Sequence, residues 1–332
     1  MAATRVRLPD ISPSAWEHPA DRAALNALRR IPGFDLALRK IVGLFGERSI
    51  RLAFRANAVK VTPVQYPWLY EQVLEVCDTL DVSPIPDVYV SQTPLVNAGA
   101  VGLDRPFIVL NSSTLEIMDR EHVKVVVAHE VGHIASGHAV YRTMLMILLR
   151  LTVTRYPLAG IAARPILYAL LEWSRKAELS SDRAGLLAVQ DPRVAMTTLM
   201  RIAGGARGED LDLDEFIAQS EEYLTSSNVL DDVYKLLSML GTTHPFAVAR
   251  VAELRKWVDS GEYGRILEGQ YRTRSSEPDA AYSQDVKDAA KGYSSAARDM
   301  FDGAAAQARQ VADQLTEVWQ AGRRPPNGQS RY

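Results

Sequence analysis

One short run of the sequence carries the residue types of a metal-dependent hydrolase. The run AHEVGHIASGH contains His129, Glu130 and His133 in the pattern HExxH. Residues four apart share a face of a helix, so the two imidazoles can bind one zinc ion together. Glu130 lies beside them and can take a proton from a zinc-bound water. The run therefore predicts a hydrolytic zinc site.

The residues before this motif predict the helix that must carry it. Asp119 is a suitable N-cap, and Val123 and Val126 follow it at helical spacing. Gly132 lowers the helix propensity between the two histidines, and we expect it to leave room beside the metal. A core helix with two buried, hydrogen-bonded histidines is the alternative interpretation.

A catalytic zinc site needs a third protein ligand, and the sequence offers two schemes for it. The metzincin-like scheme is HExxHxxGxxH, but Ser136 and Ala139 stand where it needs Gly and His. His138 is therefore predicted to lie at the surface or against a ligand. The second scheme takes Glu178 from a later helix, with Asp182 one turn on to accept the outer N–H of a ligand histidine. On spacing alone, Glu178 and Asp182 fit a solvated charged face equally well.

Composition and charge narrow the class of protein. The chain has 332 residues, 47% of them hydrophobic, and a formal net charge of −2. Such a chain can bury a large core, and its charge excludes a general polybasic surface, so nucleic acid is not an expected partner. The single Cys77 excludes an internal disulfide and a cysteine-rich zinc site. This cysteine usage, with no expected secretory signal, favours a cytoplasmic location.

The sequence predicts a mostly helical α+β protein with a small sheet before the HExxH helix. An amphipathic helix is expected over 66–80, and three short strands are expected over 87–91, 97–101 and 106–111. A long helix over 166–190 carries the second scheme's carboxylates.

Three regions follow from the pattern along the chain. Residues 1–62 are predicted to be an N-terminal helical extension, and residues 63–270 are predicted to be the domain that holds the site. Residues 271–332 are predicted to be an Ala-rich amphipathic helix and a disordered tail. We expect this helix to bind the body, a partner or a second copy.

The most apolar stretch is 144–171, MLMILLRLTVTRYPLAGIAARPILYALL. Arginines and prolines interrupt it, so it falls short of 18 uninterrupted apolar residues. Two buried helices are the favoured interpretation. A hairpin that contacts a membrane, with arginines reaching the interface, and a partner-binding surface are the alternatives.

HEVGH is followed by RKAELSSDRAG and then by THPFAVARVAEL. These three spaced elements resemble the HtpX-like zinc metallopeptidases, which are gluzincins of the family that also contains the CAAX prenyl endoprotease. That order matches the family's HExxH, its ExxxD and its His-Pro pair with an arginine six residues after the histidine. The segment VNAGAVGLDRPFIVLNSSTLEIM also resembles the strand before the family's zinc helix, and the resemblance covers residues 65–257.

The resemblance implies a zincin-like fold with one Zn²⁺ ion per chain, held by His129, His133 and Glu178. It implies that Glu130 is the general base and that Asp182 orients a ligand histidine. The expected function is a zinc-dependent endopeptidase for peptides or unfolded proteins, with protein quality control as one setting. A latent or non-cleaving zinc-bound interaction or chaperone-like module is the main alternative, and a zinc hydrolase of another class is a third.

The resemblance also implies that His244 and Arg250 line the site and that one of them stabilises the oxyanion. From the residues alone, each fits an ordinary helix position. The strand that begins with Asn97, Ala98 and Gly99 is expected to pair with an extended substrate. Members of the family in membranes have clear spanning helices, whereas no stretch of this sequence passes the length test for one. The expected membrane contact is therefore a peripheral one, through residues 144–171.

Overall fold

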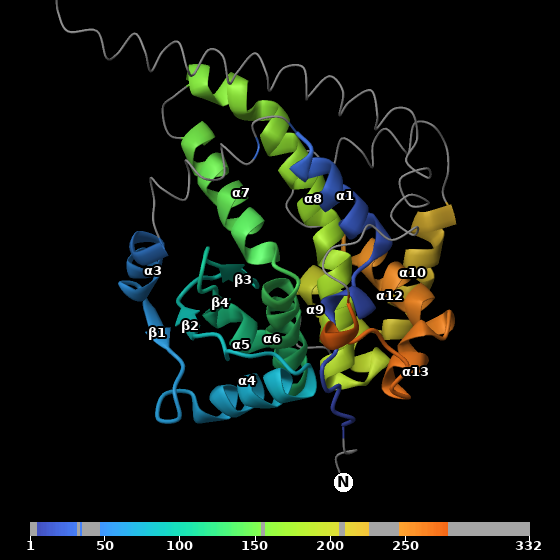
Figure 1. Ribbon diagram of the computed structural model, residues 1–332. Helices are drawn as coiled ribbons and strands as arrows, with labels where there is room; N and C mark the ends of the chain where they lie inside the picture. Colours follow the sequence, from blue (N-terminus) through green and yellow to red (C-terminus); the bar gives the residue numbers. More distant parts are fainter. Residues whose placement is uncertain are drawn as a thin grey trace, which may run out of the picture.

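The structure is a computed structural model that describes residues 5–31, 34, 47–153, 157–205, 210–225 and 246–277. In this part of the chain, helices surround one small sheet (Figure 1). The helices are α1 (Pro19–Arg29), α3 (Glu47–Arg55), α4 (Pro67–Thr79), α5 (Ser112–Ile117), α6 (Arg120–Ala135), α7 (His138–Val153), α8 (Pro157–Val189), α9 (Pro192–Gly204), α10 (Leu213–Thr225), α12 (Ala247–Asp259) and α13 (Glu262–Leu267), with short 3-10 helices at Pro13–Ala15 and Arg274–Ser276. The mostly helical α+β architecture predicted from the sequence is confirmed.

The sheet has four strands in the order β1-β2-β4-β3. Strands β2 and β4 are parallel, whereas β1 and β3 pair antiparallel with their neighbours. Three strands agree with the predicted ones to within one residue at their starts. The strand β1 lies inside the predicted helical extension and has no sequence signal of its own. The strands are β1 (Ala58–Lys60), β2 (Val88–Ser91), β3 (Ala98–Val101) and β4 (Phe107–Asn111).

The sheet separates two hydrophobic cores, because successive side chains of a strand point to opposite faces. On β4, Ile108 and Leu110 belong to the core shared with α4, α6, α9 and α12. Phe107 and Val109 belong to the core shared with α1, α7 and α8. The central strand is therefore buried on both faces.

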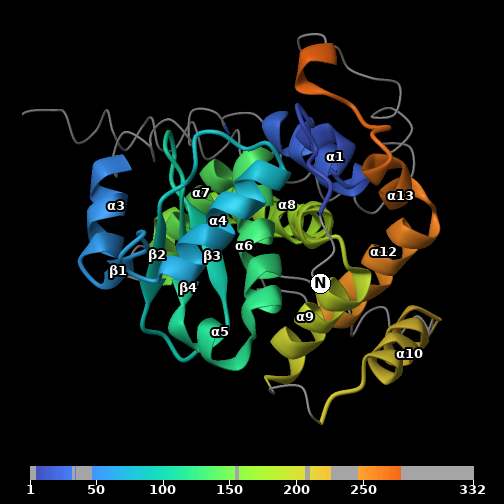
Figure 2. The same cartoon turned by 90° about the horizontal axis from the view of Figure 1, so that it is seen from below.

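Helix α6 lies at the centre of the molecule, between the sheet and α8 (Figure 2). Every residue from His122 to His133 is buried, which explains why no single apolar face is seen in its sequence. Asp119 caps its N-terminus by accepting the backbone N–H groups of Glu121 and His122. The predicted cap and the predicted motif helix are both confirmed.

Two glycines let α6 and α8 approach closely. A Cβ atom added to Gly132 would lie 2.6 Å from the Cβ atom of Ala184, and one added to Gly185 would lie 3.3 Å from the carbonyl oxygen of Val125. The sequence predicts that Gly132 leaves room beside the metal. The structure corrects this, because α8 occupies that space.

The apolar stretch 144–171 falls on α7 and α8, which pack side by side (Figure 1). This agrees with the prediction of two helices, and α8 continues through Pro165. No helix in the described part of the chain is long and apolar enough to cross a membrane. The side chains of 150–165 lie outside the described residues, as does the predicted Ala-rich helix from 278 onward.

The two ends of the described chain meet. Ile11 forms an isolated antiparallel bridge with Thr273, and the backbone N–H of Ser12 donates to the carbonyl oxygen of Arg272. Beyond this contact, α1 packs along α8. The N-terminal segment is therefore in direct contact with the helix that carries Glu178.

Candidate metal centre

Helices α6 and α8 bring His129, His133 and Glu178 together. The Nε2 atoms of the two histidines lie 3.1 Å apart. One oxygen of Glu178 lies 3.3 Å from His129 Nε2, and the other lies 3.2 Å from His133 Nε2. One ligand atom from each residue falls within 4.8 Å of the others, and all three side chains are buried. This convergence of two imidazole nitrogens and a carboxylate is the donor set of a catalytic zinc site.

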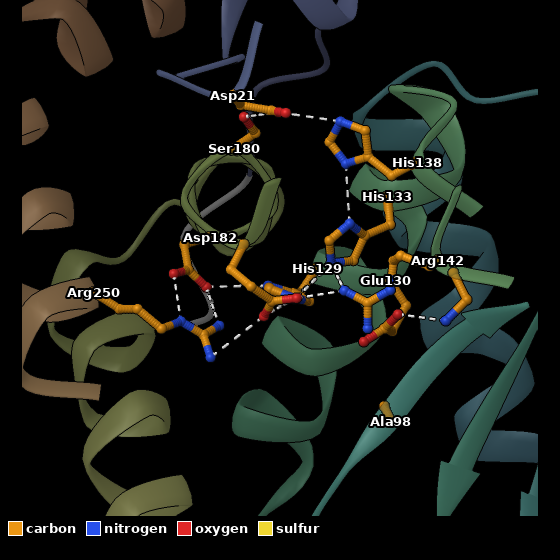
Figure 3. Close-up of polar contacts among 12 residues, drawn as sticks. Asp21, Ala98, His129, Glu130, His133, His138, Arg142, Ser180, Asp182 and Arg250 are labelled. Carbon is orange, nitrogen blue, oxygen red and sulfur yellow. Dashed lines mark hydrogen bonds and ion pairs between the residues drawn. The ribbon is translucent and has the colours of Figure 1, made fainter. Parts of the chain in front are cut away.

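A cation of the protein already lies among these donors. Arg142 of α7 places Nη1 2.7 Å from His133 Nε2 and bonds the carboxylate of Glu178 (Figure 3). The guanidinium stands in for the positive charge that a metal ion would supply. Burial lowers the pKa of Arg142, but the charges of Glu178 and Glu130 outweigh this and raise it. The donor set therefore fits a cation.

The outer nitrogen of His129 faces a carboxylate that is itself fixed. His129 Nδ1 lies 3.0 Å from Asp182 Oδ1, and Arg250 donates to both oxygens of Asp182, at 2.8 and 2.5 Å (Figure 3). Burial lowers the pKa of His129, but hydrogen bonds and charges from Asp182 and Glu178 raise it to about 9. The arrangement holds Nδ1 as the donor and directs Nε2 to Glu178.

The outer nitrogen of His133 faces a second imidazole. His133 Nδ1 lies 3.0 Å from His138 Nδ1, and His138 Nε2 lies 3.1 Å from Asp21 of α1 (Figure 3). Burial, followed by the charge of Arg142, lowers the pKa of His133 well below its usual value. Of the two expectations for His138, the structure favours the contact with a ligand, since His138 is buried.

Glu130 lies between α6 and the edge strand β3. Its Oε2 accepts the backbone N–H of Ala100 at 2.6 Å. The backbone N–H of Ala98 also points away from β4, and it donates to Asn97 Oδ1 at 2.8 Å. Gly99 lies between them, with open space where a side chain would point.

A cavity of about 440 Å³ adjoins this edge. Among its lining residues are Asn97, Ala98, His129, Glu130 and Arg250. The rest of its wall is largely apolar and includes Val125, Val126, Leu199, Ile202 and Phe246. A buried polar centre thus opens onto a pocket suited to an apolar group.

The remaining predicted residues are placed as follows. The guanidinium of Arg250 makes two bonds to Asp182 and lies 3.6 Å from Glu178, so its contacts indicate a residue that holds the centre together. His244 lies outside the described residues. Sequence reasoning missed Arg142 and Asp21. Neither residue lies at a spacing from the motif that would identify it in the sequence. His138, five residues after His133, was the one sequence signal for the contacts that lead from His133 to Asp21.

Comparisons with known proteins agree with this geometry. The model of a protein family described as "Peptidase family M48" matches residues 63–258. The plastoglobule-localized metallopeptidase 48, chloroplastic, of Arabidopsis thaliana is 32% identical over 263 residues, which are 78% of this chain and 76% of the relative. The protease HtpX homolog 2 of Saccharolobus solfataricus is 33% identical over 103 residues, 30% of this chain and 32% of the relative.

A protease HtpX homolog of Helicobacter pylori is 23% identical over 217 residues, which are 57% of this chain and 66% of the relative. No solved structure matches the chain. The resemblance stated from the three sequence elements is thereby confirmed, and such a family implies a metal cofactor, typically zinc. The chain belongs to peptidase family M48 and is a metallopeptidase.

Proposed function

We propose that this metallopeptidase is a zinc-dependent endopeptidase in which His129, His133 and Glu178 hold one zinc ion. The single observation that carries the proposal is the convergence of their three ligand atoms within 4.8 Å in a buried centre. A zinc ion held there would supply a Lewis acid for the peptide carbonyl and would lower the pKa of a water molecule. The carboxylate among the ligands offsets part of the buried positive charge.

Glu130 is the proposed general base. Its carboxylate is buried and is anchored to the N–H of Ala100, so it keeps one position between β3 and the ligand histidines. A fixed base near the metal takes the proton of the attacking water and returns it to the leaving amine. In this proposal Asp182 and Arg250 hold His129 in place.

The proposed substrate is an extended peptide that lies along β3. Such a peptide adds a strand to the edge of a sheet, and the edge next to the centre belongs to β3. Because the outward N–H groups of Ala98 and Ala100 already donate to Asn97 and Glu130, the peptide would displace the side chain of Asn97 as it pairs. The apolar wall of the adjoining cavity supports cleavage beside an apolar side chain. Unfolded proteins offer such segments, which supports a place in protein quality control.

Metal analysis and casein cleavage on the purified chain test the proposal. We expect one zinc ion per wild-type chain, and loss of both zinc and cleavage in Glu178→Ala. Glu172→Ala is the matched control, because Glu172 lies on the same helix but pairs with Arg175 and Lys176 away from the centre. Full zinc retention in Glu178→Ala would refute this ligand assignment.

Arg142 supports a second candidate, a latent form of the same enzyme. Its guanidinium bonds two of the three proposed ligands, so it and a metal ion compete for the same place. In this form the chain binds polypeptides without cleaving them. Purified chain that takes up zinc only after Arg142 is replaced would favour the latent form.

Three further proposals concern location and partners. We place the chain in the cytoplasm, with peripheral membrane contact through 144–171 and a protein contact through the helix predicted within 271–332. Their support comes from the sequence patterns alone. Co-sedimentation of the purified chain with anionic vesicles tests the membrane contact.

A further inference from the structure

The N-terminal helix α1 contributes one fully buried carboxylate to the interior. Asp21 is 1% exposed. Its Oδ1 accepts the indole N–H of Trp173 at 3.0 Å, and its Oδ2 accepts the hydroxyl of Ser180 at 2.5 Å. Both donors lie on α8, so Asp21 is held by the helix that also carries Glu178.

His138 joins this carboxylate to His133. The Nε2 of His138 lies 3.1 Å from Asp21 Oδ2, and its Nδ1 lies 3.0 Å from His133 Nδ1. If Nε2 of His133 is to bind a metal, its Nδ1 must carry the proton and donate it. His138 then accepts at Nδ1 and donates from Nε2 to Asp21. Every donor meets an acceptor in this chain of three side chains.

We propose that Asp21 is a positioning residue for the zinc ligand His133 and acts on it through His138. The inference rests on the proposed zinc site. It assigns a role in metal binding to α1, which lies outside the residues 63–258 that match the family. Each ligand histidine is then oriented by a fixed carboxylate: His129 directly by Asp182, and His133 through one imidazole by Asp21.

The position of α1 is itself set by the same contacts. The backbone N–H of His18 donates to Ser180 Oγ at 2.9 Å, and His18 Nδ1 accepts the N–H of Ala20 at the start of α1. Ser180 thus holds both the first turn of α1 and the carboxylate of Asp21. Docking of the N-terminal segment and zinc affinity are therefore coupled in this proposal.

The test measures the zinc dissociation constant by chelator competition in wild type, Asp21→Ala and Asp119→Ala. Asp119 is the matched control. It is also an aspartate that contacts a histidine, His122 Nδ1 at 2.6 Å, and it caps α6, but that histidine does not touch the ligands. Loss of an outer hydrogen-bond partner of a ligand histidine typically weakens metal binding about 10–100-fold. We expect this loss in Asp21→Ala and less than a twofold change in Asp119→Ala.

A second readout is the visible absorption spectrum of the cobalt-substituted protein. Reorientation of His133 shifts its bands in Asp21→Ala, whereas Asp119→Ala leaves them unchanged. Equal zinc affinities in Asp21→Ala and wild type would overturn the inference, and so would equal losses in both variants. If wild type itself binds no zinc, the proposed function fails first, and the two failures are thereby distinguished.

A pair of variants at His138 keeps the inference testable if Asp21→Ala does not fold. Glutamine carries an acceptor oxygen and a donor N–H in one plane, so His138→Gln can replace both hydrogen bonds of the imidazole. We expect His138→Gln to retain most of the zinc affinity that His138→Ala loses. Equal affinities in these two variants would overturn the inference.

Discussion

The two histidines of the motif share one face of α6 but have opposite pKa shifts. Both are buried, which lowers the pKa of each imidazole. His129 faces Asp182 and Glu178, and its pKa rises to about 9. His133 faces the guanidinium of Arg142, and its pKa falls well below the usual value. The neighbouring charges, not burial, therefore distinguish the two histidines.

The charged side chains contact one another within the centre. The guanidiniums of Arg142 and Arg250 contact the carboxylates of Glu178 and Asp182. In the proposed zinc site, the ion would take the place that the guanidinium of Arg142 occupies beside His133 and Glu178. Zinc binding would therefore require Arg142 to leave these two side chains.

Replacement of Arg142 by Met tests this competition. Methionine fills a similar volume but brings no charge, so the metal no longer competes with a guanidinium. We expect Arg142→Met to bind zinc roughly tenfold more tightly or better, the size of an ordinary coupling between two ligands. We also expect the metal-free form to melt at a lower temperature, because the buried carboxylate of Glu178 loses an ion-pair partner. Chelator competition and thermal unfolding measure the two effects, and weaker zinc binding would contradict the competition.

Glu130→Gln separates the base from the ligands. The amide keeps nearly the same shape but cannot take a proton, so we expect casein cleavage to fall about 10²–10⁴-fold. Zinc content should stay at the wild-type value, since Glu130 is not among the three converging donors. Retained cleavage would remove Glu130 from the role of base.

At the scale of elements, the centre depends on how closely α6 approaches α8. Two of the three converging donors come from α6 and the third comes from α8, so the distance between these helices sets the spread of the donor atoms. Gly132 and Gly185 allow the close approach. A small residue between the two histidines of the motif is thus a packing feature with a consequence for metal binding.

We expect Gly132→Ala to destabilise the protein, although alanine favours a helix more than glycine does. The added Cβ would lie 2.6 Å from that of Ala184, and overpacking of this kind costs about 1–3 kcal/mol. The double variant Gly132→Ala with Ala184→Gly should recover most of the stability and the zinc affinity. In the control Gly264→Ala, the new Cβ meets nothing within 4 Å, so stability should rise slightly. Urea unfolding of the wild type and the three variants measures these effects, and an unperturbed Gly132→Ala would show that the helices separate freely.

Local signals were sufficient to predict the elements that carry the centre. The cap at Asp119, the valines after it and the alternating strands act over a few residues, so the sequence predicted α6 and three strands to within a residue or two. The three-residue β1 is too short for such a signal, and it forms because β2 offers an edge to pair with.

Sequence reasoning could not predict the residues that reach the centre through tertiary packing. Arg142 follows His133 by nine residues, and its direction depends on how α7 packs against β3 and α8. Asp21 precedes His138 by more than a hundred residues, and only the docking of α1 on α8 brings them together. The role of Gly132 was likewise visible only once its neighbour on α8 was known.

At the scale of the whole molecule, the sheet lies between the two hydrophobic cores, and α6 carries the two histidines of the candidate metal centre. Cys77 of α4 lies in the core that also contains the motif helix, and it is 3% exposed. Burial raises the pKa of its thiol from 9.0 to about 12. At pH 8 the buried thiol then stays almost fully protonated in the folded state, so the native protein should react very slowly with thiol reagents. Modification of this single cysteine therefore reports unfolding of the core.

We expect labelling of Cys77 to be slow in the native chain at pH 8, fast in denaturant, and slower still with zinc, because a metal that binds only the folded state lowers the unfolded population. The pKa shift also fixes a pH dependence. A thiol whose pKa is raised on folding contributes stability below pH 9 that is lost as the pH rises from 9 towards about 12. In Cys77→Ala this part of the alkaline loss should disappear. A labelling rate of Cys77 that does not change when zinc is added, or rapid labelling of the native chain, would mean that α4 opens independently of the rest of the core.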